Sequence, residues 1–119
     1  MEEGKTFWAI PEGYIPEEST GPEEMKSHET FCVLNTGKTE AHLTLRIYFS
    51  DRAPQGPYHL SVPPERTRHF RFNDLRPKIP QGTDYSSTIS SDVPVIIQHT
   101  RLDSRQAANA LITTIAYGQ

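Results

Sequence analysis

The sequence predicts an all-β fold, an antiparallel β-sandwich of about eight short strands with a jelly-roll-like arrangement. Short apolar or alternating runs recur at intervals of roughly 8 to 15 residues, which is typical of strands in sandwiches. Segments that contain proline or glycine separate these runs, and no stretch has the period of a long amphipathic helix. At 119 residues, the chain is predicted to form a single domain, residues 1–119, around one core.

Composition and charge exclude several classes of protein. Fifteen acidic and twelve basic residues give a formal net charge of −3, so nucleic-acid binding is not indicated. No apolar run is as long as a membrane span and the first residues lack the features of a signal peptide, which predicts a cytoplasmic protein. The single cysteine, Cys32, has no partner for an intrachain disulfide and is interpreted as a buried, inert thiol.

The first half of the chain supplies three predicted strands. Residues 5–10 form a strand that Pro11 ends, and the proline-rich stretch after it is a surface loop. Residues 28–35 and 41–50 form two strands joined by a short turn, which predicts a hairpin. Apolar and polar residues alternate through 41–50, so one face of this strand should be buried.

The second half begins with another predicted hairpin. Its strands, 58–62 and 66–72, meet at a Pro63-Pro64 turn, and the second strand has a cationic outer face. An irregular segment that contains two prolines and a glycine follows, and residues 85–90 then form a separate short strand.

The stretch from Val93 to Gln106 is predicted to be the centre of the protein. It opens as a β-branched run typical of a strand buried on both faces and ends in charged and polar residues. With a period of two residues, His99 and Arg101 share one face with the apolar residues before them. Residues 104–110 form at most a short helical turn, because Asp103 and Gln106 resemble a capping box, and 111–117 form the last strand.

Polar clusters recur at the ends of the predicted strands. They are Trp8 with Glu12-Gly13-Tyr14, Ser27-His28-Glu29-Thr30, Arg71-Phe72-Asn73-Asp74, and Gln98-His99-Thr100-Arg101 with Asp103. Aromatic faces beside carboxylate, amide and guanidinium groups suit a polyhydroxyl or anionic small molecule. The same residues could equally be structural ion pairs, and their spacing does not separate the two interpretations. We expect His99 and Arg101 to line a ligand pocket or an inter-subunit site, with Asp103, Glu29 or Asp74 as countercharge.

Motifs for catalysis are missing from the sequence. It has no Gly-x-Ser-x-Gly elbow and no glycine-rich phosphate loop, and its five histidines show no ligand spacing. The sequence therefore predicts a protein that is not an enzyme and that has no cofactor. The alternative is a metal-assisted enzyme of cupin-like architecture that uses His28, Glu29 and His99.

Seven stretches resemble the sensory rhodopsin transducer family, in the family's order from Trp8 to Tyr117: WAIPEGYIP, SHET, IYFSD, GPY, RFNDL, VPVIIQHTRLDSRQA and TIAY. The resemblance implies a small cytoplasmic β-sandwich protein that assembles as a homotetramer and acts in signal transduction. It also implies a membrane photoreceptor or other signalling protein as partner, and a small-molecule ligand that is sugar-like or anionic. Ala108 and the acidic loop 17–24 depart from the family pattern. The resemblance to this family points to the following candidate ligand-binding residues: Trp8, Glu12, His28, Glu29, Asn73, Asp74, His99, Arg101 and Asp103.

Overall fold

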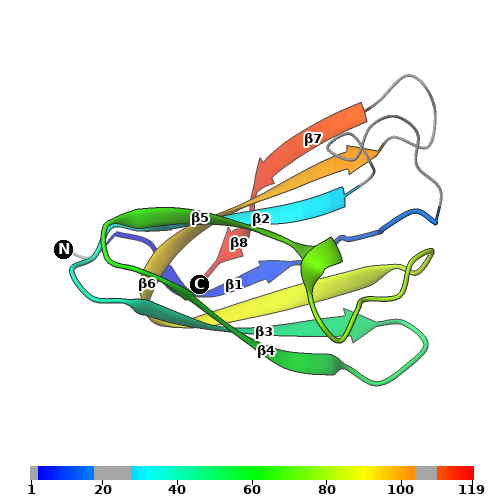
Figure 1. The fold of residues 1–119 in the computed structure, drawn as a ribbon, viewed down its shortest axis with the longest axis horizontal. Helices are drawn as coiled ribbons and strands as arrows, with labels where there is room; N and C mark the ends of the chain where they lie inside the picture. The colour runs from blue at the N-terminus through cyan, green and yellow to red at the C-terminus, as the bar shows by residue number, and fades with distance from the viewer. Residues whose placement is uncertain (1–2, 18–27, 104–109) are drawn as a thin grey trace.

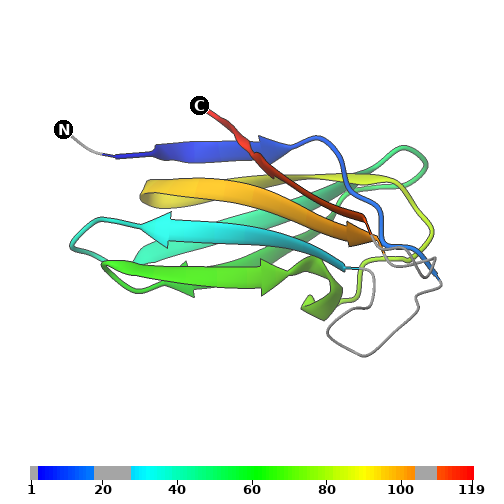
Figure 2. The same cartoon turned by 90° about the horizontal axis from the view of Figure 1, so that it is seen from above.

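The structure is a computed structural model, and it describes residues 3–17, 28–103 and 110–119. Its two packed layers of antiparallel strands confirm the predicted all-β fold (Figure 1; Figure 2). The elements are β1 (Lys5–Ile10), β2 (His28–Asn35), β3 (Ala41–Phe49), β4 (Gln55–Val62), β5 (Arg66–Arg71), the 3-10 turn η2 (Phe72–Asp74), β6 (Tyr85–Asp103), β7 (Ala110–Ile115) and β8 (Tyr117–Gly118). None of the described residues belongs to a helix long and apolar enough to cross a membrane.

Strand β6 belongs to both layers. Its first half pairs with β3 and β1 in a sheet of order β4-β3-β6-β1-β8, and its second half pairs with β2 and β7 in the other sheet, where β5 flanks β2. The prediction of two short strands here is wrong, because β6 is one strand of 19 residues. At its middle the chain passes without a turn through the exposed Asp92, which accepts a hydrogen bond from the His42 backbone N–H at 2.8 Å.

Both predicted hairpins are wrong. Strand β2 pairs with β5 and β6, whereas β3 pairs with β4 and β6, so the connections β2–β3 and β4–β5 cross from one sheet to the other. The buried Asn35 holds the two crossings together, because its Nδ2 donates to the Thr39 carbonyl at 2.9 Å and to the Val62 carbonyl at 3.1 Å. Short turns with prolines fit such crossings as well as they fit hairpins.

The end of the chain also crosses between the layers. The predicted strand 111–117 is interrupted at the buried Ala116, with β7 paired to β6 in one sheet and β8 paired to β1 in the other. The Ala116 N–H donates to the Ile97 carbonyl at 3.1 Å, which fixes the crossing point. The helical turn predicted for 104–110 lies outside the described residues, apart from Ala110, which begins β7.

The core lies between the layers and follows the predicted alternation. In β3, Ala41, Leu43, Leu45 and Ile47 are buried while the residues between them are exposed. Large side chains buried in this way each contribute roughly 1.5–3 kcal/mol. At one end of the sandwich the core becomes aromatic, and the Phe72 ring lies 5.0 Å from that of Phe31 and 5.5 Å from that of Tyr85. The polar site begins beside these rings.

Candidate functional site

The site is centred on Glu29, the second residue of β2. The register pairs Glu29 with Arg101 and Phe31 with His99, so these four side chains lie on one face of adjacent strands. The alternation predicted for β6 is confirmed up to this point, with Val95, Ile97 and His99 buried and Arg101 partly buried. Glu29 is 0% exposed, so a carboxylate sits at the end of an otherwise apolar layer.

Glu29 is hydrogen-bonded through both carboxylate oxygens. His99 Nε2 lies within hydrogen-bond distance of Oε1, at 2.6 Å. Arg101 donates to Oε2 from Nε at 3.1 Å and from Nη2 at 3.0 Å, and the backbone N–H of Tyr14 donates to the same oxygen. The buried charge is therefore compensated by an opposite charge and by hydrogen bonds, as burial of a carboxylate requires.

The Tyr14 N–H belongs to a strap, which we define as residues 11–17, that runs from β1 across this end of the sandwich. Arg101 Nη2 also donates to Glu12 of the strap at 2.9 Å, so a single guanidinium joins two carboxylates. Farther along, Gly82 N–H donates to the Ile15 carbonyl at 2.8 Å. We call Glu12, Glu29, His99 and Arg101, with the Tyr14 N–H, the Glu29 cluster; it fixes the strap to β2 and β6.

Gly13 brings the strap close to Tyr85. Its carbonyl accepts from the Tyr85 N–H at 3.0 Å, and a Cβ added to Gly13 would overlap Cε2 and Cζ of the Tyr85 ring. The position therefore requires glycine because no other residue leaves room for the ring. The close approach keeps Tyr85 within the electrostatic reach of the Glu29 cluster.

Burial and charge shift two pKa values at this site. Burial lowers the pKa of Arg101, but the carboxylates of Glu29 and Glu12 more than offset this, so its pKa lies above the ordinary value. Burial, and then the charge of Glu29, raise the pKa of Tyr85, whose hydroxyl therefore stays protonated. That hydroxyl is buried and has no hydrogen-bond partner in the part of the chain that the structure describes.

The structure brings together five of the residues singled out from the sequence. Besides the Glu29 cluster, Asn73 joins through its Oδ1, which accepts from the backbone N–H of Glu29 at 3.2 Å. The countercharge of Arg101 is supplied by Glu29, one of three expected candidates, and additionally by Glu12. Because the lone pairs of Glu29 are engaged by these donors, this carboxylate is suited to holding the strap rather than to acting as a base or nucleophile.

The other four residues lie elsewhere or have no described side chain. Trp8 is buried in the middle of β1, and its indole Nε1 donates to the carbonyls of Lys5 and Val95, both at 3.1 Å. Asp74 is exposed on the 3-10 turn. His28 and Asp103 lie in β2 and β6, and their side chains are outside the described residues.

A metal site has only partial support from the side chains. Among the described residues, no group of three or more His, Cys, Asp or Glu side chains is placed to hold a metal ion. Glu29 and His99 of the metal-assisted alternative do meet, whereas the side chain of its third residue, His28, is not described.

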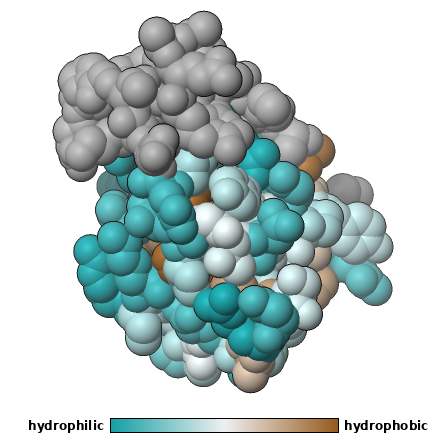
Figure 3. Space-filling view, turned by 90° about the vertical axis from the view of Figure 1, so that its right-hand side faces the viewer, coloured by the Kyte–Doolittle hydropathy of each residue, from teal (hydrophilic) through white to brown (hydrophobic). Residues whose placement is uncertain are grey.

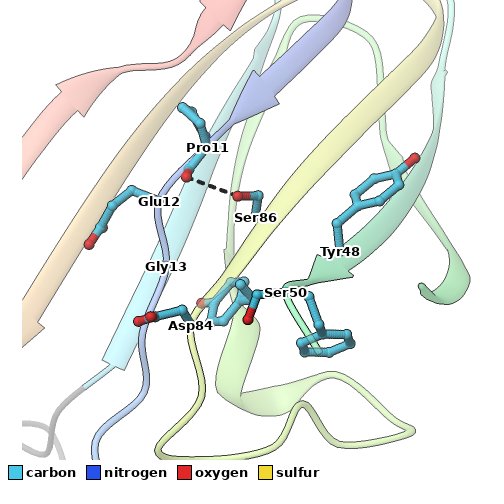
Figure 4. Close-up of a pocket in the computed structure, with 9 residues that line it drawn as sticks. Pro11, Glu12, Gly13, Tyr48, Ser50, Asp84 and Ser86 are labelled. Carbon is cyan, nitrogen blue, oxygen red and sulfur yellow. Dashed lines mark hydrogen bonds between the residues drawn. The ribbon is translucent and has the colours of Figure 1, made fainter. Parts of the chain in front are cut away.

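A hollow of about 520 Å³ lies beside the strap, and its lining includes residues that the polar clusters did not suggest. Glu12 and Tyr85 connect it to the Glu29 cluster. Figure 4 shows Ser86 between Pro11 and Tyr48, and Figure 3, which looks onto this end of the sandwich, shows mostly hydrophilic residues. The alternation of apolar and polar residues along β3 could have indicated Tyr48, because it places this residue on the exposed face of the strand. The lining residues are Pro11, Glu12, Gly13, Tyr48, Phe49, Ser50, Asp84, Tyr85 and Ser86.

These features define a small β-sandwich domain with an ion-paired strap and an adjoining hollow. The family model described as Anabaena sensory rhodopsin transducer matches residues 3–118, so the chain belongs to this family and the predicted resemblance is confirmed. The structure of the Anabaena sensory rhodopsin transducer is similar at 53% identity and a TM-score of 0.75, covering 84% of this chain and 100% of that one. The crystal structure of Thermotoga maritima 1070 is similar at 34% identity and a TM-score of 0.89, covering 98% and 97%. No curated protein matches the sequence.

Proposed function

We propose that this protein is a cytoplasmic signal transducer that couples to a membrane photoreceptor of the sensory rhodopsin kind. The observation that carries the proposal is the match to the Anabaena sensory rhodopsin transducer, at 53% identity over 100% of that chain. The receptor would be contacted by surface loops rather than by the sandwich core, because loops carry adaptable recognition on a rigid scaffold.

Binding to Anabaena sensory rhodopsin in lipid nanodiscs tests this function directly. We expect saturable binding to receptor-loaded nanodiscs and none to empty nanodiscs of the same lipid composition, which serve as the matched control. The titration extends to about 1 mM, where a Kd corresponds to a binding free energy of only about 4 kcal/mol. Equal signals from loaded and empty nanodiscs up to that concentration would refute the coupling to this receptor.

We further propose that the protein acts as a homotetramer. Leu34 and Ile115 support self-association, because they are 42% and 62% exposed. The register Cys32–Gln98–Ile115 places Ile115 on the face of its sheet that also holds Cys32 and Leu34. Light scattering should return about four times the monomer mass of 13.5 kDa. A monomer mass at micromolar concentration would contradict this part of the proposal.

A second proposed function is the sensing of a small molecule without catalysis. The hollow beside the strap supports it, because 520 Å³ falls within the range of about 300 to 1,000 Å³ usual for ligand sites. A thermal-shift screen of sugars, sugar acids and nucleotides tests it, since a ligand that binds only the folded state raises Tm. The rival metal-assisted enzyme would be supported instead by a stoichiometric transition metal in protein purified without a histidine tag.

A further inference from the structure

The outer face of the sheet that contains β3 and the first half of β6 carries three chemically different residues in a row beside the hollow: Arg46, Tyr48 and Asp84. Along β3, Arg46 and Tyr48 are both exposed on this face, and across from them on β6 the register places Thr88 and Ser86. Asp84, two residues before Ser86, is exposed and lines the hollow. The surface thus changes from a cation through an aromatic ring to an acid.

The distance between its two charged ends limits the size of a matching ligand. From Asp84 to Thr88, the partner of Arg46, the chain advances four residues, or about 13 Å at roughly 3.3 Å per residue. A free amino acid is too short to reach both ends. The ligand must be elongated, with hydrogen-bond donors at one end and an anionic group at the other.

The middle of this surface suits a flat ring. Tyr48 is 39% exposed and lines the hollow, Ser86 and Thr88 on the paired strand β6 are small, and Figure 4 shows Ser86 between Tyr48 and Pro11 of the strap. The Ser86 hydroxyl donates to the Pro11 carbonyl at 2.9 Å and keeps the edge of the strap in place. An aromatic base can stack on the tyrosine ring, while hydroxyl groups of a sugar can reach Ser86 and Thr88.

Arg46 is the cation at the end of this surface away from Asp84, and no described acid is paired with it. No hydrogen bond or ion pair links Arg46 to another residue in the part of the chain that the structure describes. By contrast, exposed Arg52 is paired with Asp51 at 3.0 Å. Arg46 can therefore form a charge-assisted pair with an incoming phosphate without breaking an existing one.

We propose that this surface binds a nucleoside monophosphate, with the phosphate on Arg46, the base against Tyr48 and the amino group of the base toward Asp84. The inference rests on the proposed small-molecule function and names the ligand class. A neutral sugar leaves Arg46 unused, and a long polyanion is repelled by the exposed Asp84 at the other end. Adenosine 5′-monophosphate (AMP) matches this surface, because it has a phosphate for Arg46, a base that can stack on Tyr48 and a donor amino group for Asp84, with a pentose between the phosphate and the base.

Titration of the ¹⁵N-labelled full chain with AMP, followed by NMR, tests the proposal. We expect shifts at Tyr48, Ser86 and Thr88, and adenosine without its phosphate should bind at least tenfold more weakly. Arg46→Gln should weaken AMP at least tenfold but leave adenosine unchanged, and Tyr48→Ala should weaken both. Arg66→Gln, an exposed arginine on the other sheet, is the matched control and should bind AMP as the wild type does.

Several outcomes would overturn the nucleotide proposal. They are the absence of AMP-induced shifts in a folded protein at millimolar AMP, equal AMP affinity of Arg46→Gln and the wild type, and shifts confined to other surfaces. If glucuronate shifts the same residues and AMP does not, the nucleotide class is wrong while small-molecule sensing stands. If no compound in the screen binds, both are wrong, and the receptor-binding measurement remains an independent test of transduction.

Discussion

Removal of the Arg101 side chain tests whether the Glu29 cluster holds the strap. In Arg101→Ala, Glu29 would lose both guanidinium hydrogen bonds and its compensating charge, and would keep His99 and the Tyr14 N–H. Breaking a buried ion pair from one side costs about 3 to 5 kcal/mol, because the remaining charge is left uncompensated. The Arg101 side chain is 23% exposed and water can enter part of its site, so we expect about 3 kcal/mol.

The loss can be measured by urea unfolding followed by circular dichroism at pH 7. For a domain of this size, about 3 kcal/mol corresponds to a decrease in Tm of roughly 10 °C. Protein concentration must be the same for all variants, because assembly stabilises the folded state by mass action. A lower midpoint with an unchanged m-value would show a change in stability rather than in the unfolded state.

Two further variants separate the contribution of the Arg101–Glu29 pair from that of the Arg101–Glu12 pair. Glu12→Gln removes only the Arg101–Glu12 pair, and because the Glu12 side chain is 64% exposed, the loss of stability should be below about 1 kcal/mol. Arg101→Lys keeps the charge but not the planar fork, so its loss should be intermediate. The reasoning is refuted if Arg101→Ala stays within about 0.5 kcal/mol of the wild type, the usual range for surface substitutions, or if Glu12→Gln is as damaging.

Three other predictions follow from the same region and from the sheet surface. Tyr85→Phe removes a buried hydroxyl without a partner and should be neutral or stabilising by up to about 1 kcal/mol in urea unfolding, whereas a clear loss would mean that the hydroxyl is satisfied. Gly13→Ala should destabilise by roughly 1 to 3 kcal/mol, because the added Cβ overlaps the Tyr85 ring, and calorimetry showing an unchanged Tm would contradict this packing. The hydrogen bond and charge of Asp92 raise the pKa of His42, and the backbone and side-chain hydrogen bonds of His42 lower the pKa of Asp92. The pair should therefore stabilise fully between pH 3.8 and 6.5, losing the Asp92 part as the pH falls and the His42 part as it rises. An NMR titration of His42 should show a midpoint above 6.5 that Asp92→Asn moves back, and an unchanged midpoint would disprove the pairing.

Most strand positions could be predicted because they depend on local patterns, although the break predicted within β6 is absent and the interruption at Ala116 was not predicted. Alternation in β3 and in β6 reports which side chains face the core, and the inward placement of His99 followed from it. The partners of each strand could not be predicted in the same way. The turns near Asn35 and at Pro63 connect strands that are consecutive in the sequence, yet each turn crosses from one sheet to the other. The buried Asn35 amide donates hydrogen bonds to carbonyls in both turns and so stabilises the two crossings.

The centre of the site was predictable only in part, for a related reason. Glu29 and Arg101 meet through the β2–β6 register, which could be expected from two polar strand ends that need opposite charges. Glu12 reaches Arg101 across 89 residues of sequence, and its place depends on how the strap folds over Tyr85. The deciding feature is Gly13, because only a residue without a side chain lets the strap lie against that ring. Since Glu12 and Tyr85 also line the hollow, the shape of the proposed ligand site depends on the same ion pairs that fix the strap, and a change in the Glu29 cluster should alter both.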